Sequence, residues 1–188
     1  MEDLWIFAYG SLMWQPGFEY EETRVARLFG YHRAFCIYAW TFRGTREKPG
    51  LVLGLDRGGS CLGRAYRVRG DRREEVMRYL DAREVPGLEN TDVLIDVYMR
   101  KCLSLTLDTK GAGPTSVKAV CYVADLRHPQ YTGKLDRAEQ AQLIRQGHGT
   151  RGSSIDYLEN TIRHLDELGI ADGPLHQLWA DVRVRPDE

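Results

Sequence analysis

The stretch Phe7–Trp14, FAYGSLMW, decides how the chain begins to fold. It continues an apolar run, Leu4-Trp5-Ile6, which predicts a buried strand. Gly10 and Ser11 interrupt this run, although neither residue is typical core material. Glycine permits the close approach of a ligand, and successive backbone N–H groups beside a hydroxyl can bind an anion. The pattern therefore predicts a strand that leads into either a plain turn or an anion-binding loop.

Two common functional loops are excluded at this position. Residues 9–13 read YGSLM, which does not fit the G-x-S-x-G elbow of serine hydrolases. The chain also contains no G-x-x-x-x-G-K-[ST] phosphate loop. The five histidines show no metal-ligand spacing, so we expect no metal site.

Composition points to an ordinary globular protein. The 188 residues are enough for one domain with its own core, and no linker divides them, so we expect a single domain over residues 1–188. Lys and Arg total 26 against 27 Asp and Glu, which gives no reason to expect nucleic acid or an anionic membrane as a partner. No apolar run approaches the roughly 18 residues that a membrane span needs. The acidic start Met1-Glu2-Asp3 does not resemble a signal peptide, and we expect a cytoplasmic protein.

The four cysteines form no CxxC pair, and each lies in an apolar segment. Free cysteine is among the most buried residue types, so we expect buried thiols rather than disulfides. A cluster of arginines, Arg64, Arg67, Arg69, Arg72 and Arg73, is interpreted as a solvated surface.

The order of the predicted elements indicates an α+β fold. The first two-thirds read mostly as strands punctuated by glycine and proline, with one helix from about Arg72 to Glu84. The last third is helical, over Arg137–Gln146, Ser154–Leu168 and Leu175–Val182. We therefore expect a small mixed β-barrel flanked by helices, with a helical C-terminal third. The predicted strands are Trp5–Tyr9, Arg24–Phe29, Arg33–Trp40, Leu51–Leu55, Cys61–Val68, Thr91–Tyr98, Cys102–Leu107 and Val117–Val123.

The helix that ends at Glu84 carries an unusual carboxylate. Val76, Leu80 and Glu84 are spaced four residues apart and so line one helix face, where a leucine would be expected in place of Glu84. Burial and the negative end of the helix dipole both raise the pKa of a carboxyl group, which suits it to move protons near neutral pH. Arg83 could oppose this shift by pairing with Glu84. The pattern equally allows Glu84 to mark the helix end and reach solvent. Asp81 lies at the edge of the same face and could be structural.

Together, the YGSL loop and the helix ending YLDARE resemble the ChaC-type, glutathione-specific γ-glutamylcyclotransferases. The resemblance runs from Trp5 to about Leu168. Its other supporting pieces are Trp14, GYHRAF at Gly30–Phe35, KPG at Lys48–Gly50, CLGRAYRV at Cys61–Val68, Tyr131 in HPQYTG, and GTRGSSIDYL at Gly149–Leu158.

This resemblance implies a set of site residues. The loop of Tyr9, Gly10, Ser11 and Leu12 would bind the γ-glutamyl group, Glu84 would be the catalytic carboxylate, and Tyr131 would line the same pocket. The chain departs from the family pattern in two places. The glycine-rich segment usually reads G-x-S-G-x-N, and here Arg151 and Ser154 replace its serine and asparagine; after the catalytic Glu, the run Val85–Leu88 lacks the usual aromatic residue.

The implied reaction cyclises the γ-glutamyl unit of glutathione to 5-oxoproline and releases Cys-Gly, with no cofactor or metal. Independently of the resemblance, Arg43 could pair with a substrate carboxylate. Two other functions stay open: cyclisation of other γ-glutamyl amines or amino acids, which the departures at Arg151 and Ser154 keep in play, and non-enzymatic small-molecule binding on the same fold.

Overall fold

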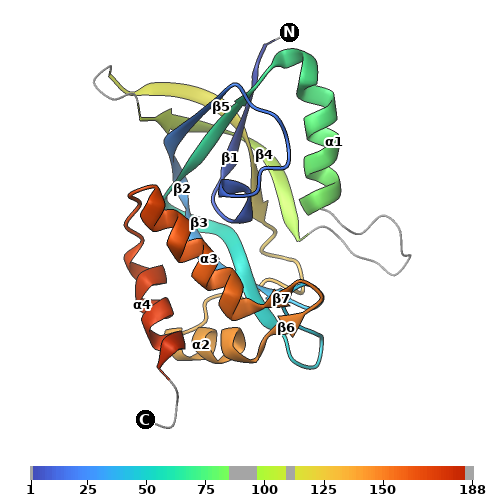
Figure 1. Cartoon of the computed structure of the whole chain (residues 1–188), viewed down its shortest axis with the longest axis vertical. Coiled ribbons are helices and arrows are strands. Elements are labelled where there is room, and N and C mark those ends of the chain that lie inside the picture. The colour runs from blue at the N-terminus through green and yellow to red at the C-terminus, as the bar shows by residue number, and fades with distance from the viewer. Residues whose placement is uncertain (1, 85–96, 109–112, 185–188) are drawn as a thin grey trace. The chain divides into compact units, whose positions relative to one another are not determined.

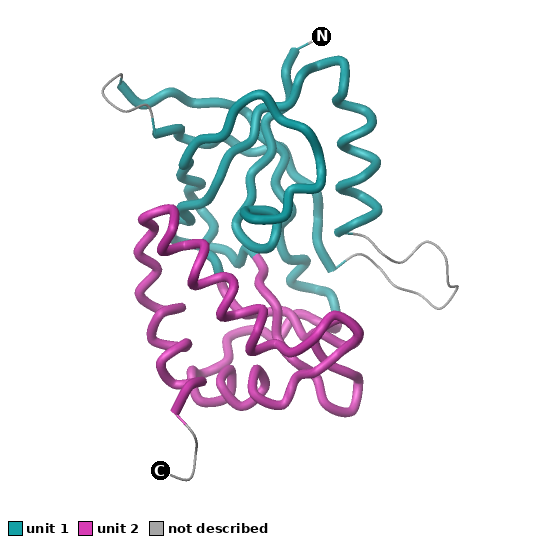
Figure 2. Tube along the Cα trace, in the orientation of Figure 1, with its two compact units in different colours: residues 1–33, 55–128 teal, residues 34–54, 129–188 magenta. Residues whose placement is uncertain are grey.

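The computed structural model describes residues 2–84, 97–108 and 113–184. The chain divides into two compact units, which Figure 2 colours separately. Unit 1 comprises residues 1–33 and 55–128, and unit 2 comprises residues 34–54 and 129–188. The expected single domain over residues 1–188 stays a prediction.

Five strands close into a barrel in the order β1-β3-β2-β4-β5 (Figure 1). Strand β1 pairs antiparallel with β3, as in Ile6 opposite Tyr66, and parallel with β5, as in Ile6 opposite Val120. Strand β4 pairs antiparallel with both β2 and β5. The barrel contains both parallel and antiparallel pairs and is therefore mixed, as the sequence predicted. The strands span Leu4–Ala8 (β1), Glu22–Ala39 (β2), Gly50–Val68 (β3), Tyr98–Leu107 (β4) and Thr115–Ala124 (β5).

The predicted breaks inside β2 and β3 are wrong. Each of these strands was expected as two pieces, but β2 runs through Gly30 and β3 runs through Gly58 and Gly59. These glycines have φ angles of +82°, +97° and +66°, which only glycine adopts readily. Such residues bend a strand without ending it, as in a β-bulge, so the glycines mark kinks rather than boundaries. The strand predicted over Thr91–Tyr98 lies outside the described residues except for its last two positions.

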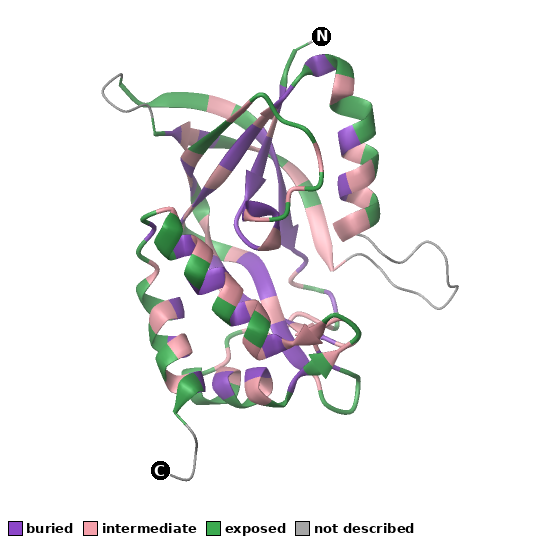
Figure 3. Ribbon diagram, viewed as in Figure 1, coloured by how far each residue is buried: buried purple, intermediate pink, exposed green. Residues whose placement is uncertain are grey.

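Helix α1, Arg73–Glu84, follows a 3-10 turn, η2, at Gly70–Arg72. Val76 and Leu80 are buried, and buried positions recur along one side of the helix (Figure 3). Asp81 contacts β4 and β5 through Arg100 and Tyr122, so this side of α1 faces the barrel wall. The predicted helix face is therefore confirmed.

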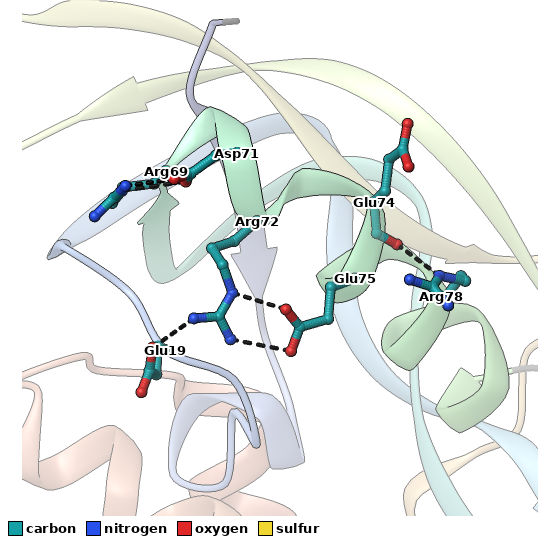
Figure 4. A network of polar contacts seen from close by, with 7 residues as sticks. All are labelled: Glu19, Arg69, Asp71, Arg72, Glu74, Glu75 and Arg78. Carbon is teal, nitrogen blue, oxygen red and sulfur yellow. Dashed lines mark hydrogen bonds and ion pairs between the residues drawn. The ribbon is translucent and has the colours of Figure 1, made fainter.

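The exposed side of α1 carries paired charges (Figure 4). The Arg72 guanidinium donates to both oxygens of Glu75 at 2.7 and 3.0 Å and to Glu19 at 2.8 Å. Arg69 pairs with Asp71 in the same way at the start of the helix. Arg67 likewise pairs with Asp3 and Glu22, so three of the five clustered arginines are neutralised at the surface, which fits their interpretation from the sequence.

Cys102 corrects the expectation of four buried thiols. Cys36, Cys61 and Cys121 are buried, but Cys102 is exposed. On β4, Cys102 shares its alternation with the exposed Arg100 and Ser104, so its side chain points to the outside of the sheet.

Unit 2 contains the three predicted C-terminal helices. Helices α2 and α3 both begin with a capping box, formed by Asp136 with Glu139 and by Ser153 with Asp156. Within the described residues, no helix is long and apolar enough to cross a membrane. The elements of this unit are α2 (Arg137–Gln146), β6 (His148–Gly149), β7 (Gly152–Ser153), α3 (Ser154–Glu167), α4 (Gly173–Arg183) and the adjoining ends of β2 and β3.

The barrel is closely packed at Gly63. A Cβ atom at this position would lie 2.3 Å from the Ala8 carbonyl oxygen and 2.8 Å from the Phe7 ring. We therefore predict that Gly63→Ala lowers the free energy of unfolding by about 1–3 kcal/mol, as overpacking does. Gly173→Ala is the matched control, because a Cβ there meets nothing within 4 Å, and its effect should stay within about 0.5 kcal/mol. Urea unfolding of both variants measures the difference, and equal stabilities would contradict the prediction.

Candidate active site

The chain leaves β1 and turns at once into a short 3-10 helix, η1, at Ser11–Met13. The turn is closed by the Met13 amide, which donates to the Gly10 carbonyl at 2.8 Å, and by the Gln15 amide, which donates to the Ser11 carbonyl at 2.9 Å. Tyr9, Gly10 and Leu12 are buried, while Ser11 is partly exposed. The YGSL segment is thus an ordered loop, not a flexible connection.

A buried arginine fixes the start of this loop. The Arg33 side chain, 6% exposed, donates from Nε to the Tyr9 carbonyl and from Nη2 to the Leu62 carbonyl, both at 2.6 Å. A peptide carbonyl and the following N–H point in opposite directions. Because the Tyr9 carbonyl points to Arg33, the Gly10 N–H points away from it.

The end of the loop is held by two further donors from β3. The Tyr66 hydroxyl lies 3.0 Å from the Leu12 carbonyl oxygen and 2.9 Å from that of Met13. Arg64 also donates to the Met13 carbonyl, at 2.8 Å. Side chains of the barrel therefore bind the loop through its carbonyl oxygens.

The N–H groups of the same loop are left available. In the part of the chain that the structure describes, the amides of Gly10, Ser11 and Leu12 donate to no other residue. Three successive amides next to a serine hydroxyl form a concentration of hydrogen-bond donors. Such a concentration suits a carboxylate or a developing oxyanion.

Glu84 occupies the last described position of α1, on the same face as Val76 and Leu80. Its side chain is 18% exposed, so it does not extend freely into solvent. Burial raises the pKa of the Glu84 carboxyl, and the neighbouring Arg83 charge opposes that shift. A carboxyl group in these surroundings can exchange protons closer to neutral pH than a surface glutamate.

Arg83 joins this carboxylate to the loop. Its Nε lies 3.5 Å from Glu84 Oε1, while Nη2 donates to Ser11 Oγ at 2.9 Å. Nη1 donates to the Gln15 carbonyl at 2.6 Å and to the Tyr79 hydroxyl at 2.9 Å. One guanidinium therefore brings the loop and the carboxylate together within unit 1.

Asp81 is structural, as the sequence allowed. It accepts a 2.8 Å hydrogen bond from the Tyr122 hydroxyl and pairs with Arg100. Burial and the Asp81 carboxylate raise the pKa of Tyr122, and the Glu84 charge adds to this effect. Tyr122 therefore stays protonated and faces the carboxylate region from β5.

The other two predicted site residues lie in unit 2. Arg43 is half-buried, donates to the Ser153 carbonyl at 3.2 Å and lies over the Tyr157 ring. Burial lowers the pKa of Arg43, opposed by the charges of Tyr157 and Asp156. Tyr131 forms an isolated bridge with Ile37 of β2. In the described residues, no group of three or more His, Cys, Asp and Glu side chains could hold a metal ion.

Sequence reasoning missed Arg33, Tyr66 and Tyr122. Strand alternation could have found Arg33, because it shares a face with Phe35, Ile37 and Ala39, all of which are buried. A charge at such a position must be satisfied inside the protein. Tyr66 and Tyr122 have no comparable signal, since a tyrosine in a strand is usually a packing residue.

The chain matches the family model described as ChaC-like protein over residues 4–185. It is 35% identical over 180 residues to the glutathione-specific γ-glutamylcyclotransferase of Escherichia coli, covering 96% of this chain and 73% of the relative. It is 34% identical over 157 residues to glutathione-specific γ-glutamylcyclotransferase 1 of Mus musculus, covering 82% of this chain and 66% of the relative.

Solved structures support the same relationship at the level of fold. The crystal structure of a γ-glutamylcyclotransferase specific to glutathione from yeast aligns with a TM-score of 0.84. It covers 97% of this chain and 96% of the yeast chain at 20% identity. The expected γ-glutamylcyclotransferase-like α+β fold is therefore confirmed, and the chain belongs to the ChaC-like protein family.

Proposed function

We propose that this protein is a γ-glutamylcyclotransferase that degrades glutathione to 5-oxoproline and Cys-Gly. The names of the relatives from Escherichia coli and Mus musculus support the substrate. The observation that carries the proposal is the recessed Glu84 carboxylate, joined through Arg83 to a loop rich in hydrogen-bond donors.

The chemistry needs few protein groups. Glutathione links the γ-carboxyl of glutamate to cysteine by an amide, and the same glutamyl unit carries a free α-amine. That amine attacks the γ-carbonyl carbon, a five-membered lactam closes, and Cys-Gly leaves as an amine. The reaction requires removal of a proton from the α-ammonium, stabilisation of the oxyanion and protonation of the leaving nitrogen. Orienting the substrate in this folded form can supply about 7–11 kcal/mol of the barrier.

Glu84 is proposed as the group that moves both protons. As a carboxylate it accepts a proton from the α-ammonium, and as the resulting acid it gives a proton to the leaving nitrogen. The raised pKa of its carboxyl makes the Glu84 carboxylate a stronger base toward the α-ammonium than an ordinary glutamate. The amides of Gly10, Ser11 and Leu12 are proposed to bind either the substrate α-carboxylate or the oxyanion. Arg43 and Tyr131 remain proposed substrate-binding residues.

The alternative substrates are other γ-glutamyl amines or amino acids. Of the two departures that suggested them, Ser154 is accounted for by structure: its buried hydroxyl donates to the Leu51 carbonyl at 2.7 Å and accepts from the Leu51 amide at 3.0 Å. Arg151 is exposed and lies over the Phe42 ring. Arg151 therefore still keeps the alternative open.

The substrate is tested by incubating purified protein with glutathione, γ-glutamyl-alanine and γ-glutamyl-ε-lysine and measuring 5-oxoproline. We expect glutathione to be converted with the highest kcat/KM. Preferential conversion of another γ-glutamyl compound would replace glutathione by that substrate class, and no 5-oxoproline from any of them would overturn the proposed function.

The role of Glu84 is tested by Glu84→Gln. This variant should fold and lose activity by a factor of at least about 100, because the amide cannot move a proton. Glu74→Gln is the matched control, since Glu74 is an exposed acid of the same helix, and it should keep full activity. A Glu84→Gln variant that still converts glutathione at a near-normal rate would refute the assignment.

The pKa shift at Glu84 also predicts a pH-dependent stability. Burial raises the pKa of Glu84 in the folded state above its value in the unfolded state. As the pH rises from the lower of these two pKa values through the higher one, ionisation of Glu84 therefore lowers the free energy of unfolding. Glu84→Gln should therefore be more stable than the wild type at pH about 8, and the difference should vanish near pH about 3, where Glu84 is protonated in both the folded and the unfolded state. Urea midpoints across this range measure the effect; a variant less stable than the wild type at pH 8 would contradict it.

A further inference from the structure

We propose that Arg83 is a positioning residue that turns the Ser11 hydroxyl into a hydrogen-bond donor toward the substrate and holds the YGSL loop against Glu84. The inference rests on the proposed function and goes beyond it, because it assigns a role to a residue that need not touch the substrate. It also assigns the carboxylate or carbonyl oxygens of the substrate to the loop.

The first support is the number of bonds that this side chain makes. Arg83 is only 17% exposed, and its guanidinium contacts Ser11, Gln15, Tyr79 and Glu84. Arg78, five residues earlier and on the solvent side, reaches only the Glu74 carbonyl, at 3.4 Å, among the residues that the structure describes. An arginine held at four points is pre-organised, whereas an exposed one is not.

The second support is the direction of the bond to Ser11. A guanidinium has only donors, so Ser11 Oγ must be the acceptor in its 2.9 Å contact with Arg83. The single proton of the serine hydroxyl is then free to point elsewhere. Together with the amides of Gly10, Ser11 and Leu12, it completes a loop surface made of donors alone.

A surface of donors discriminates between the oxygen atoms of a γ-glutamyl group and its α-ammonium. It accepts carboxylate or carbonyl oxygens and disfavours an ammonium, which also has only donors. The substrate α-ammonium is therefore directed to an acceptor, the Glu84 carboxylate, which Arg83 holds beside the loop. Arg83 contacts both Ser11 and Glu84. It therefore couples the placement of a substrate oxygen on the loop to the placement of the substrate α-amine at Glu84.

The third support is electrostatic. Among the described residues, the groups around Glu84 are Arg83 on α1, the protonated Tyr122 on β5, and behind them the Asp81–Arg100 pair that joins α1 to β4. Arg83 provides the positive charge in contact with Glu84, so its removal should raise the pKa of this carboxyl further. The acidic limb of the kcat/KM profile, which reports the ionisation of the base in the free enzyme, should then move to higher pH.

The experiment compares Arg83→Met, Arg83→Lys, Ser11→Ala and the double variant Ser11→Ala/Arg83→Met, with Arg78→Met as the matched control. We expect Arg83→Met to lower kcat/KM for glutathione at least about tenfold and to move the acidic limb to higher pH. Arg83→Lys keeps the charge but cannot span all four partners, so kcat/KM should fall while the limb stays in place. The double variant should be little worse than the poorer single variant, because both changes break one unit. Arg78→Met should behave as the wild type.

The inference would be overturned if Arg83→Met kept wild-type activity and an unchanged acidic limb. The link through Ser11 would be overturned if the double variant lost activity by the product of the two single-variant factors. A readout that needs no turnover separates this result from the proposed function. In an Arg83→Met background, the stabilisation that Glu84→Gln brings at pH about 8 should exceed that in the wild-type background. No increase would contradict the inference even if the wild type converted no γ-glutamyl compound.

Discussion

The structure of the candidate site depends on one constraint, a carboxylate placed on the apolar face of a helix. Glu84 continues the stripe of Val76 and Leu80, and its burial raises the pKa of its carboxyl. A buried charge is tolerated only with a partner. Arg83 is that partner, and because it also binds Ser11, the group that offsets the burial of Glu84 is the group that ties the loop to the helix.

The loop follows a complementary rule. Arg33, Arg64 and Tyr66 bind its carbonyl oxygens from the barrel, which leaves successive N–H groups available on the loop. The barrel thus supports a short segment whose carbonyl oxygens it binds and whose N–H groups it leaves available. Such pre-organisation stabilises a developing charge without rearrangement during the reaction. We propose that in this ChaC-like protein the recessed acid and the donor loop together carry out the intramolecular cyclisation.

Local sequence rules predicted the helix of the site better than its strands. The four-residue spacing placed Glu84 on the buried face, and the helices predicted over Arg137–Gln146 and Ser154–Leu168 correspond closely to α2 and α3. The breaks at Gly30 and Gly58-Gly59 were wrong because glycine signals a turn and a kinked strand equally. Strand alternation could have marked Arg33 as buried, but Tyr122 is brought to the site by barrel closure, a long-range pairing that no short sequence pattern encodes. The residues after Glu84, including Val85–Leu88 and Glu89, lie outside the described part of the chain.

The most direct test of this account is the pKa of the Glu84 carboxyl itself, measured by NMR titration of protein carrying ¹³C-labelled glutamate, with Glu84→Gln identifying the resonance. The account predicts a pKa above that of an ordinary glutamate, and a further rise when Arg83 is replaced by methionine. A pKa at or below the ordinary value would mean that the carboxyl is solvated or fully neutralised by its partner. The central claim, a buried acid kept ready to move a proton, would then be contradicted.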